Sequence, residues 1–337
     1  RVKARVKAHA LREIMLTHDK IFVMGHKNPD ADCVGAALGI YRLSKTLGKS
    51  TYIVMDKDCP AIEPIVEGIY KERADEEEDI FVTNEEALLL KDKSAMLIVV
   101  DVNLPAMTEC PELLKSVSTI VVLDHHRQNN ETIKNAVVSY VEPYASSTCE
   151  MVAEILQYIV DKPKLKNIEA DAMYSGILVD TDNFVIKAGV RTFEAAAFLR
   201  RAGADVTRVR KMFREDMEHC RIRTAIINKA EIYMNEFAIS TFDGANVSGA
   251  TVVGAKAANA LLNIQGIRGS FVLTSLQDCI YISARSIDEL NVQVIMEKFN
   301  GGGHLTMAAA QLKAVTLEEA NQQLEDVLQQ MREDGDI

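Results

Sequence analysis

Short runs of consecutive apolar residues, many of them β-branched, divide the first half of the chain into regular segments. They cover residues 21–25, 50–55, 95–101 and 118–124. Uninterrupted apolar runs are typical of parallel strands that are buried on both faces. The stretches between them are longer and have helical spacing, most clearly over residues 33–47. The alternation predicts an α/β fold with a mostly parallel sheet and helices on both of its faces.

Two later helices can be placed by the residues that begin them. Ser147 and Glu150 have the spacing of a capping box, and so do Thr316 and Glu319 near the end of the chain. In a capping box the first residue accepts a hydrogen bond from the third helical amide, and the third helical side chain returns one. We therefore predict helices that begin directly after Ser147 and Thr316.

The pattern changes after about residue 190. Residues 190–223 are rich in Arg and Glu and contain no strand pattern, whereas residues 230–242 and 270–286 alternate apolar and polar side chains. Such alternation is typical of antiparallel strands with one exposed face, so we predict a smaller α+β domain here. Its glycine-rich segment, residues 300–312, is expected to form a tight turn that is followed by a helix. The predicted boundaries are a first domain over residues 1–195 with an N-terminal helix, a helical linker over 196–223 and a second domain over 224–337.

The composition fits two domains and excludes several classes of protein. The 337 residues suffice for two domains of ordinary size, and 48% hydrophobic with 26% charged residues is the balance of a soluble globular chain. No apolar run reaches the roughly 18 to 20 residues that a membrane-spanning helix needs. The net charge of −11 argues against binding to long nucleic acids. The six cysteines form no CxxC pair, so neither a zinc knuckle nor a disulfide framework is indicated.

Acidic and histidine residues follow three of the predicted strands and one predicted helix. The carboxyl ends of parallel strands meet at one edge of a sheet, and ligands of open α/β sheets bind in the crevice beyond that edge. We therefore expect these side chains to lie close together. They are His26, Asp30 and Asp32 after the first strand, Asp101 at the end of the third, Asp124, His125 and His126 at the end of the fourth, and Asp180 at the end of the helix.

Such a cluster of acids requires compensating charge. Two carboxylates roughly 4 Å apart repel each other by about 4 kcal/mol at an effective dielectric of about 20, so several of them in one crevice need protons or cations. Imidazole and carboxylate ligands without thiolates suit manganese better than structural zinc. Asp30 and Asp32 project to the same side of an extended loop. Each can serve one ion, with Asp101 as the candidate bridge between two ions.

Several of these residues also have a purely structural alternative. Asp32 can be only the N-cap of the helix that follows it, Asp124 only a turn former, and His26 only a surface histidine. These alternatives weaken together, because four separate segments would have to place an acid or a histidine at the same sheet edge by accident. Cys33 is expected to be a packing residue.

Four segments carry a resemblance to a known family. GHKNPDAD at 25–32, VVDVN at 99–103, LDHH at 123–126 and LVDTDNF at 178–184 resemble, in this order, the four motifs of the DHH phosphoesterase superfamily. The second half, with SAR at Ser283–Arg285 and GGGH at Gly301–His304, resembles the associated DHHA1 domain. Within the superfamily, the chain is most similar to the catalytic region of membrane-anchored bacterial cyclic-di-AMP phosphodiesterases of the GdpP type.

The resemblance implies two Mn²⁺ ions per chain. It implies one ion on His26, Asp30 and Asp101. It implies the other on Asp32, Asp101, His125 and Asp180. Asp124 would then orient a histidine, and His126 would donate a hydrogen bond to the scissile phosphate, with a purely structural role as the alternative for His126.

The resemblance assigns substrate binding to the second domain. Arg285 can hold a second phosphate with a bidentate fork, although a surface salt bridge is the alternative. Glycines allow a close approach of the backbone, and the amides at the start of the helix expected after His304 would form an anion site. A plain turn is the alternative for this loop. The expected substrate-binding residues are Ser283, Arg285, Gly301, Gly302, Gly303 and His304.

The activity implied by the resemblance is hydrolysis of cyclic-di-AMP to linear pApA by a water activated between two metals. The alternatives are a nanoRNA or oligonucleotide 5′-exonuclease and a nucleotide-binding regulatory module without turnover. A pyrophosphatase is less favoured because those enzymes have a different second domain. The resemblance also implies a homodimer and a cytoplasmic location. The chain begins with Arg1, which agrees with a catalytic region preceded by a membrane anchor and sensor domains.

Overall fold

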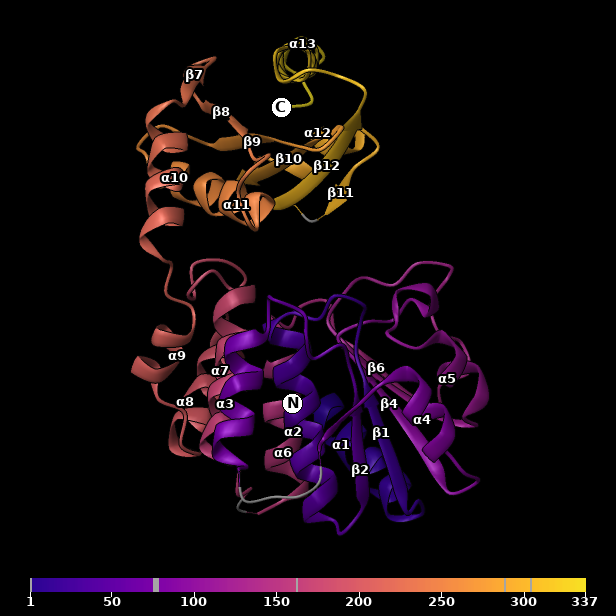
Figure 1. Ribbon diagram of the computed structural model, residues 1–337. Helices are drawn as coiled ribbons and strands as arrows, with labels where there is room; N and C mark the ends of the chain where they lie inside the picture. The colour runs from indigo at the N-terminus through magenta and orange to yellow at the C-terminus, as the bar shows by residue number, and fades with distance from the viewer. Residues whose placement is uncertain (1, 75–78, 162, 288, 304) are drawn as a thin grey trace. The chain divides into compact units, whose positions relative to one another are not determined.

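The computed structural model describes residues 2–74, 79–161, 163–287, 289–303 and 305–337, and the chain forms two compact units (Figure 1). Unit 1 comprises Arg1–Arg214 and unit 2 comprises Glu215–Ile337. The division falls inside residues 196–223, the segment expected to be a helical linker. Within the described residues, no helix is both long enough and apolar enough to cross a bilayer.

Unit 1 is built on a parallel sheet of six strands in the order β3-β2-β1-β4-β5-β6. This confirms the predicted parallel sheet, and the four apolar runs each form one of its strands. The short edge strands β3 and β6 are missing from the sequence prediction, because neither contains a long apolar run. The strands are β1 (Lys20–Met24), β2 (Ser50–Val54), β3 (Phe81–Val82), β4 (Ala95–Val100), β5 (Thr119–Asp124) and β6 (Val138–Val141).

Helices cover both faces of this sheet, as the apolar runs predict (Figure 1). Successive residues of β1 point to opposite faces of the sheet. Val23 lies in the core beneath α2 and α7, whereas Phe22 lies in the core beneath α4 and α5. The helices of unit 1 are α1 (Val2–Leu16), α2 (Ala31–Thr46), α3 (Glu63–Glu72), α4 (Asn84–Leu90), α5 (Pro111–Ser116), α6 (Thr148–Ile159), α7 (Asn167–Asp180), α8 (Val190–Arg201) and α9 (Val206–Met212), with a short 3₁₀ helix at Pro105–Met107.

The start of α6 differs from a complete capping box. The Ser147 side chain accepts the Glu150 amide, which is the predicted cap. The Glu150 carboxylate does not return to Ser147. It accepts hydrogen bonds from the amide and hydroxyl of Ser146, and from the Thr192 hydroxyl on α8, at 2.5 Å for Ser146 Oγ and 2.6 Å for Thr192 Oγ1. Glu150 is 2% exposed, so its carboxylate fixes the beginning of α6 against α8.

Unit 2 is an α+β unit with a mixed sheet in the order β11-β12-β10-β9-β8-β7, in which only β8 and β9 are parallel. Helices α10 and α11 share one core with the sheet, and helices α12 and α13 share another. The elements are α10 (Met217–Asn228), β7 (Glu231–Tyr233), β8 (Phe237–Asp243), α11 (Ala250–Leu261), β9 (Gly269–Leu276), β10 (Cys279–Ser286), α12 (Val292–Glu297), β11 (Gly302–Gly303), β12 (Met307–Lys313) and α13 (Leu317–Glu333).

The prediction of a helix within residues 300–312 is wrong. Residues Met307–Lys313 form strand β12, which pairs antiparallel with β10 along its whole length. Ala308 and Ala310 are buried while Ala309 between them is exposed, which is the two-residue period of a strand. Alanine favours helices over most residues by only about 0.5 kcal/mol each, so a full ladder of hydrogen bonds to β10 outweighs the local preference. The capping box predicted at Thr316 and Glu319 is confirmed in both directions.

Candidate metal centre

The sheet order explains why distant segments meet. Strands β1, β4 and β5 are adjacent and parallel, so their carboxyl ends lie next to one another at one edge. Helix α7 brings its last residue to the same place. The structure therefore brings together all of the expected ligands, which are His26, Asp30, Asp32, Asp101, His125 and Asp180.

The side chains fall into two groups that share Asp101. In the first group, His26 Nε2 lies 3.4 Å from Asp101 Oδ2 and 3.8 Å from Asp30 Oδ1. In the second group, His125 Nε2 lies 3.1 Å from Asp180 Oδ2, 3.5 Å from Asp101 Oδ1 and 3.9 Å from Asp32 Oδ2. Asp101 thus offers one oxygen to each group, which is the geometry that a bridging carboxylate requires.

The backbone at Asp101 is unusual. Its φ is +61°, in the left-handed region that few residues other than Gly, Asn and Asp adopt. Its amide donates to Leu123 O on the neighbouring strand at 2.9 Å, and its side chain is 2% exposed. The chain therefore turns sharply at the end of β4 and holds this carboxylate in the buried centre of the cluster.

Asp30 and Asp32 have different local roles. Asp30 is the N-cap of α2, because its Oδ1 accepts the amides of Asp32 and Cys33 at 3.0 Å. The helix thus begins two residues before the predicted position, and the alternative that Asp32 is only its N-cap is wrong. Instead Asp32, which is fully buried, accepts the first two amides of α6, from Thr148 at 2.7 Å and Cys149 at 2.8 Å.

Glycines allow three helices to converge on Asp32. A Cβ at Gly176 on α7 would lie 2.8 Å from the Asp32 Cα and 2.6 Å from Cys149 Sγ on α6. A Cβ at Gly35 on α2 would lie 2.6 Å from a backbone oxygen of α7. Real Cβ atoms do not approach other atoms this closely, so glycine is required at both positions. The position of Asp32 is therefore determined by the packing of α2, α6 and α7.

The electrostatics of the cluster favour the uptake of positive charge. Burial raises the pKa of Asp101 well above its usual value, and the neighbouring Asp32 adds to the effect. Burial and Asp32 together raise the pKa of Asp180 to about 6. Burial opposes protonation of the imidazoles, but hydrogen bonds to Asp101 and Asp30 outweigh it and raise the pKa of His26 to about 11.

His125 behaves in the same way. Burial alone would lower its pKa, but the hydrogen bond to Asp180 and the charge of Asp32 raise it to about 10. The surrounding carboxylates thus favour the protonated forms of both imidazoles. The donor set of carboxylate oxygens and imidazole nitrogens fits divalent cations, which would replace these protons. Cys33 Sγ lies within reach of His26 and Asp101, but burial raises its pKa, so this side chain remains a neutral thiol.

A second set of hydrogen bonds holds His126. Its Nδ1 lies 2.8 Å from Asp124 Oδ1, and its amide donates to the same oxygen at 3.1 Å. The other oxygen of Asp124 accepts Asn103 Nδ2 at 2.5 Å, and that amide group also donates to His126 O. Although burial opposes it, the hydrogen bond from His126 lowers the pKa of Asp124, so an ionised carboxylate orients the imidazole. Asn103 belongs to the VVDVN segment, but its role as the partner of Asp124 is not apparent from the sequence.

In unit 2, two of the expected substrate-binding residues lie on β10. Arg285 donates from Nε to Asn259 Oδ1 on α11 at 2.6 Å and from Nη1 to Ala284 O at 2.9 Å. Ser283 lines a cavity of about 660 Å³ together with Gly301 and Gly302. The cavity lies over the exposed face of β10 and β12.

The glycine loop has a structural reason for its composition. A Cβ at Gly301 would lie 2.2 Å from Ala309 O, and a Cβ at Gly303 would lie 2.4 Å from Met307 O. These glycines therefore let β11 pack closely on β12. Because a strand and not a helix follows them, the anion site expected at a helix start is wrong. His304, also expected to bind substrate, lies outside the described residues.

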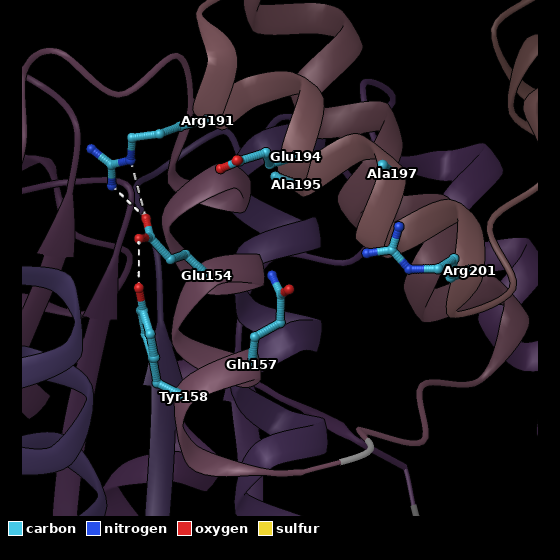
Figure 2. A pocket seen from close by; sticks show the side chains of 8 residues that line it. All are labelled: Glu154, Gln157, Tyr158, Arg191, Glu194, Ala195, Ala197 and Arg201. Carbon is cyan, nitrogen blue, oxygen red and sulfur yellow. Dashed lines mark hydrogen bonds and ion pairs between the residues drawn. The ribbon is translucent and has the colours of Figure 1, made fainter.

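Another cavity, of about 350 Å³, lies between α6 and α8 (Figure 2). Arg191 and Glu154 lie side by side in its lining and form an ion pair at 2.6 Å, and the Tyr158 hydroxyl donates to Glu154 (Figure 2). None of the described residues that line this cavity is one of the expected metal ligands. It is a polar hollow of the helical layer, separate from the cluster at the sheet edge.

Comparisons with known proteins match both halves of the chain to known domains. The model of the DHH family, N-terminal domain, matches residues 20–177, and the model of the DHHA1 domain matches residues 238–331. The cyclic-di-AMP phosphodiesterase PdeA of Listeria monocytogenes is 42% identical over 327 residues, which are 96% of this chain and 49% of that protein. The cyclic-di-AMP phosphodiesterase GdpP of Bacillus subtilis is 38% identical over 339 residues, 99% of this chain and 51% of that protein.

The chain spans about half the length of these curated relatives. Among solved structures, an exopolyphosphatase-related protein from Bacteroides fragilis has the same fold, with a TM-score of 0.78 at 20% identity, over 97% of this chain and 96% of that one. Both family models follow each other here in the order that the motifs predict. The chain is therefore a member of the DHH family, with an N-terminal DHH domain followed by a DHHA1 domain.

Proposed function

We propose that this chain is a metal-dependent phosphodiesterase that hydrolyses cyclic-di-AMP to linear pApA. The observation that carries the proposal is the pair of side-chain groups that share Asp101, one centred on His26 and the other on His125. The substrate class is supported by relatives named as cyclic-di-AMP phosphodiesterases at 38% to 42% identity.

We assign one Mn²⁺ to His26, Asp30 and Asp101, and a second to Asp32, Asp101, His125 and Asp180. When bound, two such ions supply an activated water and neutralise the charge that develops on the phosphate. The protein's own contribution is to hold the carboxylates in fixed orientations. Asp32 accepts two backbone amides and Asp101 accepts the Thr148 hydroxyl, so both are oriented before an ion arrives.

His126 and Asp124 are proposed to act on the phosphate and not on the metals. Asp124 holds His126 through Nδ1, which assigns the contact with the scissile phosphate to Nε2. A donor at that position stabilises the charge that grows on the phosphate oxygens in the transition state. Asn103 fixes Asp124 in turn.

Unit 2 is proposed to bind the remainder of the dinucleotide. A cyclic dinucleotide has two phosphates, and only one of them can occupy the metal pair. Arg285 is held in place by Asn259 and is suited to a bidentate contact with the other phosphate. We assign further contacts to Ser283, Gly301, Gly302, Gly303 and His304.

We further propose that the chain acts as a homodimer and as the cytoplasmic catalytic region of a longer, membrane-anchored bacterial protein with upstream sensor domains. The support is that the matched curated relatives are about twice as long as the region they share with this chain.

Incubation with Mn²⁺ and a panel of phosphate compounds tests the proposed function. The panel contains cyclic-di-AMP, cyclic-di-GMP, pApA, pyrophosphate and a short oligoribonucleotide, and the products are separated by chromatography. Preferred conversion of cyclic-di-AMP to pApA, abolished by a chelator, is the expected result. Faster cleavage of the oligoribonucleotide would favour the exonuclease alternative, and binding of cyclic-di-AMP without any product would favour the regulatory module.

A further inference from the structure

The first turn of α6 contacts two of the assigned metal ligands at once. Thr148, the first residue of this helix, is fully buried. Its amide donates to Asp32 Oδ2 at 2.7 Å and its hydroxyl donates to Asp101 Oδ1 at 2.9 Å. Asp32 belongs to the second group alone, whereas Asp101 belongs to both groups. A single residue therefore ties the shared carboxylate to a carboxylate of the second group.

The Thr148 hydroxyl contacts Asp101 at Oδ1, the oxygen that faces the second group. Asp101 Oδ2 faces His26, whereas Oδ1 faces His125 at 3.5 Å and His126 Nδ1 at 3.7 Å. A carboxylate can bridge two ions only when each oxygen is turned towards its own ion. The left-handed backbone fixes the Cα of Asp101, but rotation of the carboxylate plane is limited by what its oxygens contact. The Thr148 hydroxyl supplies a directional contact of this kind.

Thr148 is itself held rigidly. Ser147 caps the helix, and the buried Glu150 carboxylate ties the same turn to Ser146 and to Thr192 on α8. Thr148 is β-branched, so its own χ1 rotation is restricted as well. The hydroxyl is therefore presented to Asp101 in one position, without a loss of side-chain freedom when ions bind.

We propose that Thr148 is a positioning residue that sets the orientation of the Asp101 carboxylate and thereby the bridging of the two metal ions. This inference rests on the proposed metal-dependent function and adds a residue that touches neither ion nor substrate. Outer hydrogen-bond partners of metal ligands typically contribute about 10- to 100-fold to metal affinity or activity.

The test compares three variants of the full chain. Thr148→Val keeps the shape and removes the hydroxyl, and Thr148→Ser restores a hydroxyl. Thr192→Val removes a hydroxyl-to-carboxylate bond of the same helix turn, the one to Glu150, which is not a ligand. Mn²⁺ affinity is measured by calorimetric titration, and the bridged pair by the exchange-coupled signal in electron paramagnetic resonance. The melting temperature of the metal-free protein is recorded for each variant.

Thr148→Val should weaken binding of the second Mn²⁺ by about 10- to 100-fold and diminish the exchange-coupled signal, and Thr148→Ser should restore most of both. Thr192→Val should lower the melting temperature while leaving Mn²⁺ affinity near the parent value. The proposal is overturned if Thr148→Val binds both ions like the parent, or if Thr192→Val loses as much affinity, because the effect would then come from loosening of α6. If Thr148→Val does not fold, Thr148→Ala is measured in the same way.

These readouts separate the inference from the proposed function. If the parent protein binds two coupled Mn²⁺ ions but hydrolyses no nucleotide, the proposed activity fails while the role of Thr148 is still tested. If the parent binds only one ion, the bridging role of Asp101 is wrong, and the inference about Thr148 falls with it.

Discussion

The two sheets of the molecule present very different chemistry. The carboxyl edge of the parallel sheet in unit 1 gathers four aspartates and two imidazoles, half of them buried, from the ends of β1, β4, β5 and α7. The exposed face of β10 and β12 in unit 2 lines a cavity with hydroxyl and amide groups, a single lysine and glycine backbone. Buried charge of this kind is costly unless cations are bound, whereas the described residues that line the unit 2 cavity are mostly uncharged. Substitutions in unit 1 should therefore change metal content and turnover, and substitutions in unit 2 should change substrate affinity.

The largest effect is expected from Asp101→Asn in unit 1. Asparagine has nearly the same shape and tolerates the left-handed backbone, so the fold should survive. The variant loses the negative charge that both groups share, and we expect it to lose both ions and to fall to the activity of the chelated parent. Metal analysis of the purified variant, together with its turnover of cyclic-di-AMP, checks this. Retention of two ions would contradict the assignment of Asp101 as the bridge.

Gly176→Ala tests whether helix packing holds Asp32 in place. The added Cβ would lie 2.8 Å from the Asp32 Cα, so α7 or Asp32 must move, and overpacking of a core typically costs about 1–3 kcal/mol. We expect a lower melting temperature and weaker Mn²⁺ binding. Gly189→Ala is the matched control, because a Cβ there meets nothing within 4 Å. Equal Mn²⁺ affinity in the two variants would show that this packing does not position the ligand.

His126→Ala should separate chemistry from metal binding within unit 1. The side chain is held by Asp124 at 2.8 Å and lies farther from Asp101, at 3.7 Å, so both ions should remain bound. Loss of a donor to the phosphate should lower kcat by about 10²-fold. His125→Ala, in contrast, should lower metal occupancy. Comparable loss of metal from both variants, measured by anomalous scattering, would remove the distinction between the two histidines.

The smallest effect is expected from Arg285→Ala in unit 2. A hydrogen bond to a charged group contributes about 1.5–3 kcal/mol, so kcat/KM for cyclic-di-AMP should fall by roughly 10- to 100-fold through KM. Hydrolysis of bis-p-nitrophenyl phosphate, which is too small to reach a second site, should be unchanged. Asn259→Ala, which removes the side-chain partner of Arg285, should give a weaker version of the same pattern. An equal fractional loss on both substrates would mean that Arg285 supports the fold.

The contrast between the units also explains what the sequence could predict. In unit 1, uninterrupted apolar runs identified four strands, and the topology of a parallel sheet placed their ends together. The residues at those ends were therefore predictable as one cluster. Thr148 was not, because its contacts with Asp32 and Asp101 cross from the start of α6 to α2 and β4, and the local sequence indicates only a helix cap.

In unit 2 the local pattern was misleading. The partner of β12 is β10, which precedes it by about twenty residues along the chain, and no property of three consecutive alanines indicates such a partner. The apolar faces of a strand and a helix built from alanine are equally small. Only pairing with β10 distinguishes them, and this pairing depends on the tertiary structure.

The left-handed backbone at Asp101 limits how this site can change in evolution. Glutamate preserves the acidic group but tolerates a positive φ much less readily than Asp, Asn or Gly. A chain that drifts away from catalysis while keeping this fold is therefore expected to replace Asp101 by Asn or Gly. A relative with Asn or Gly at this position is expected to have the same fold but no metal-dependent hydrolysis.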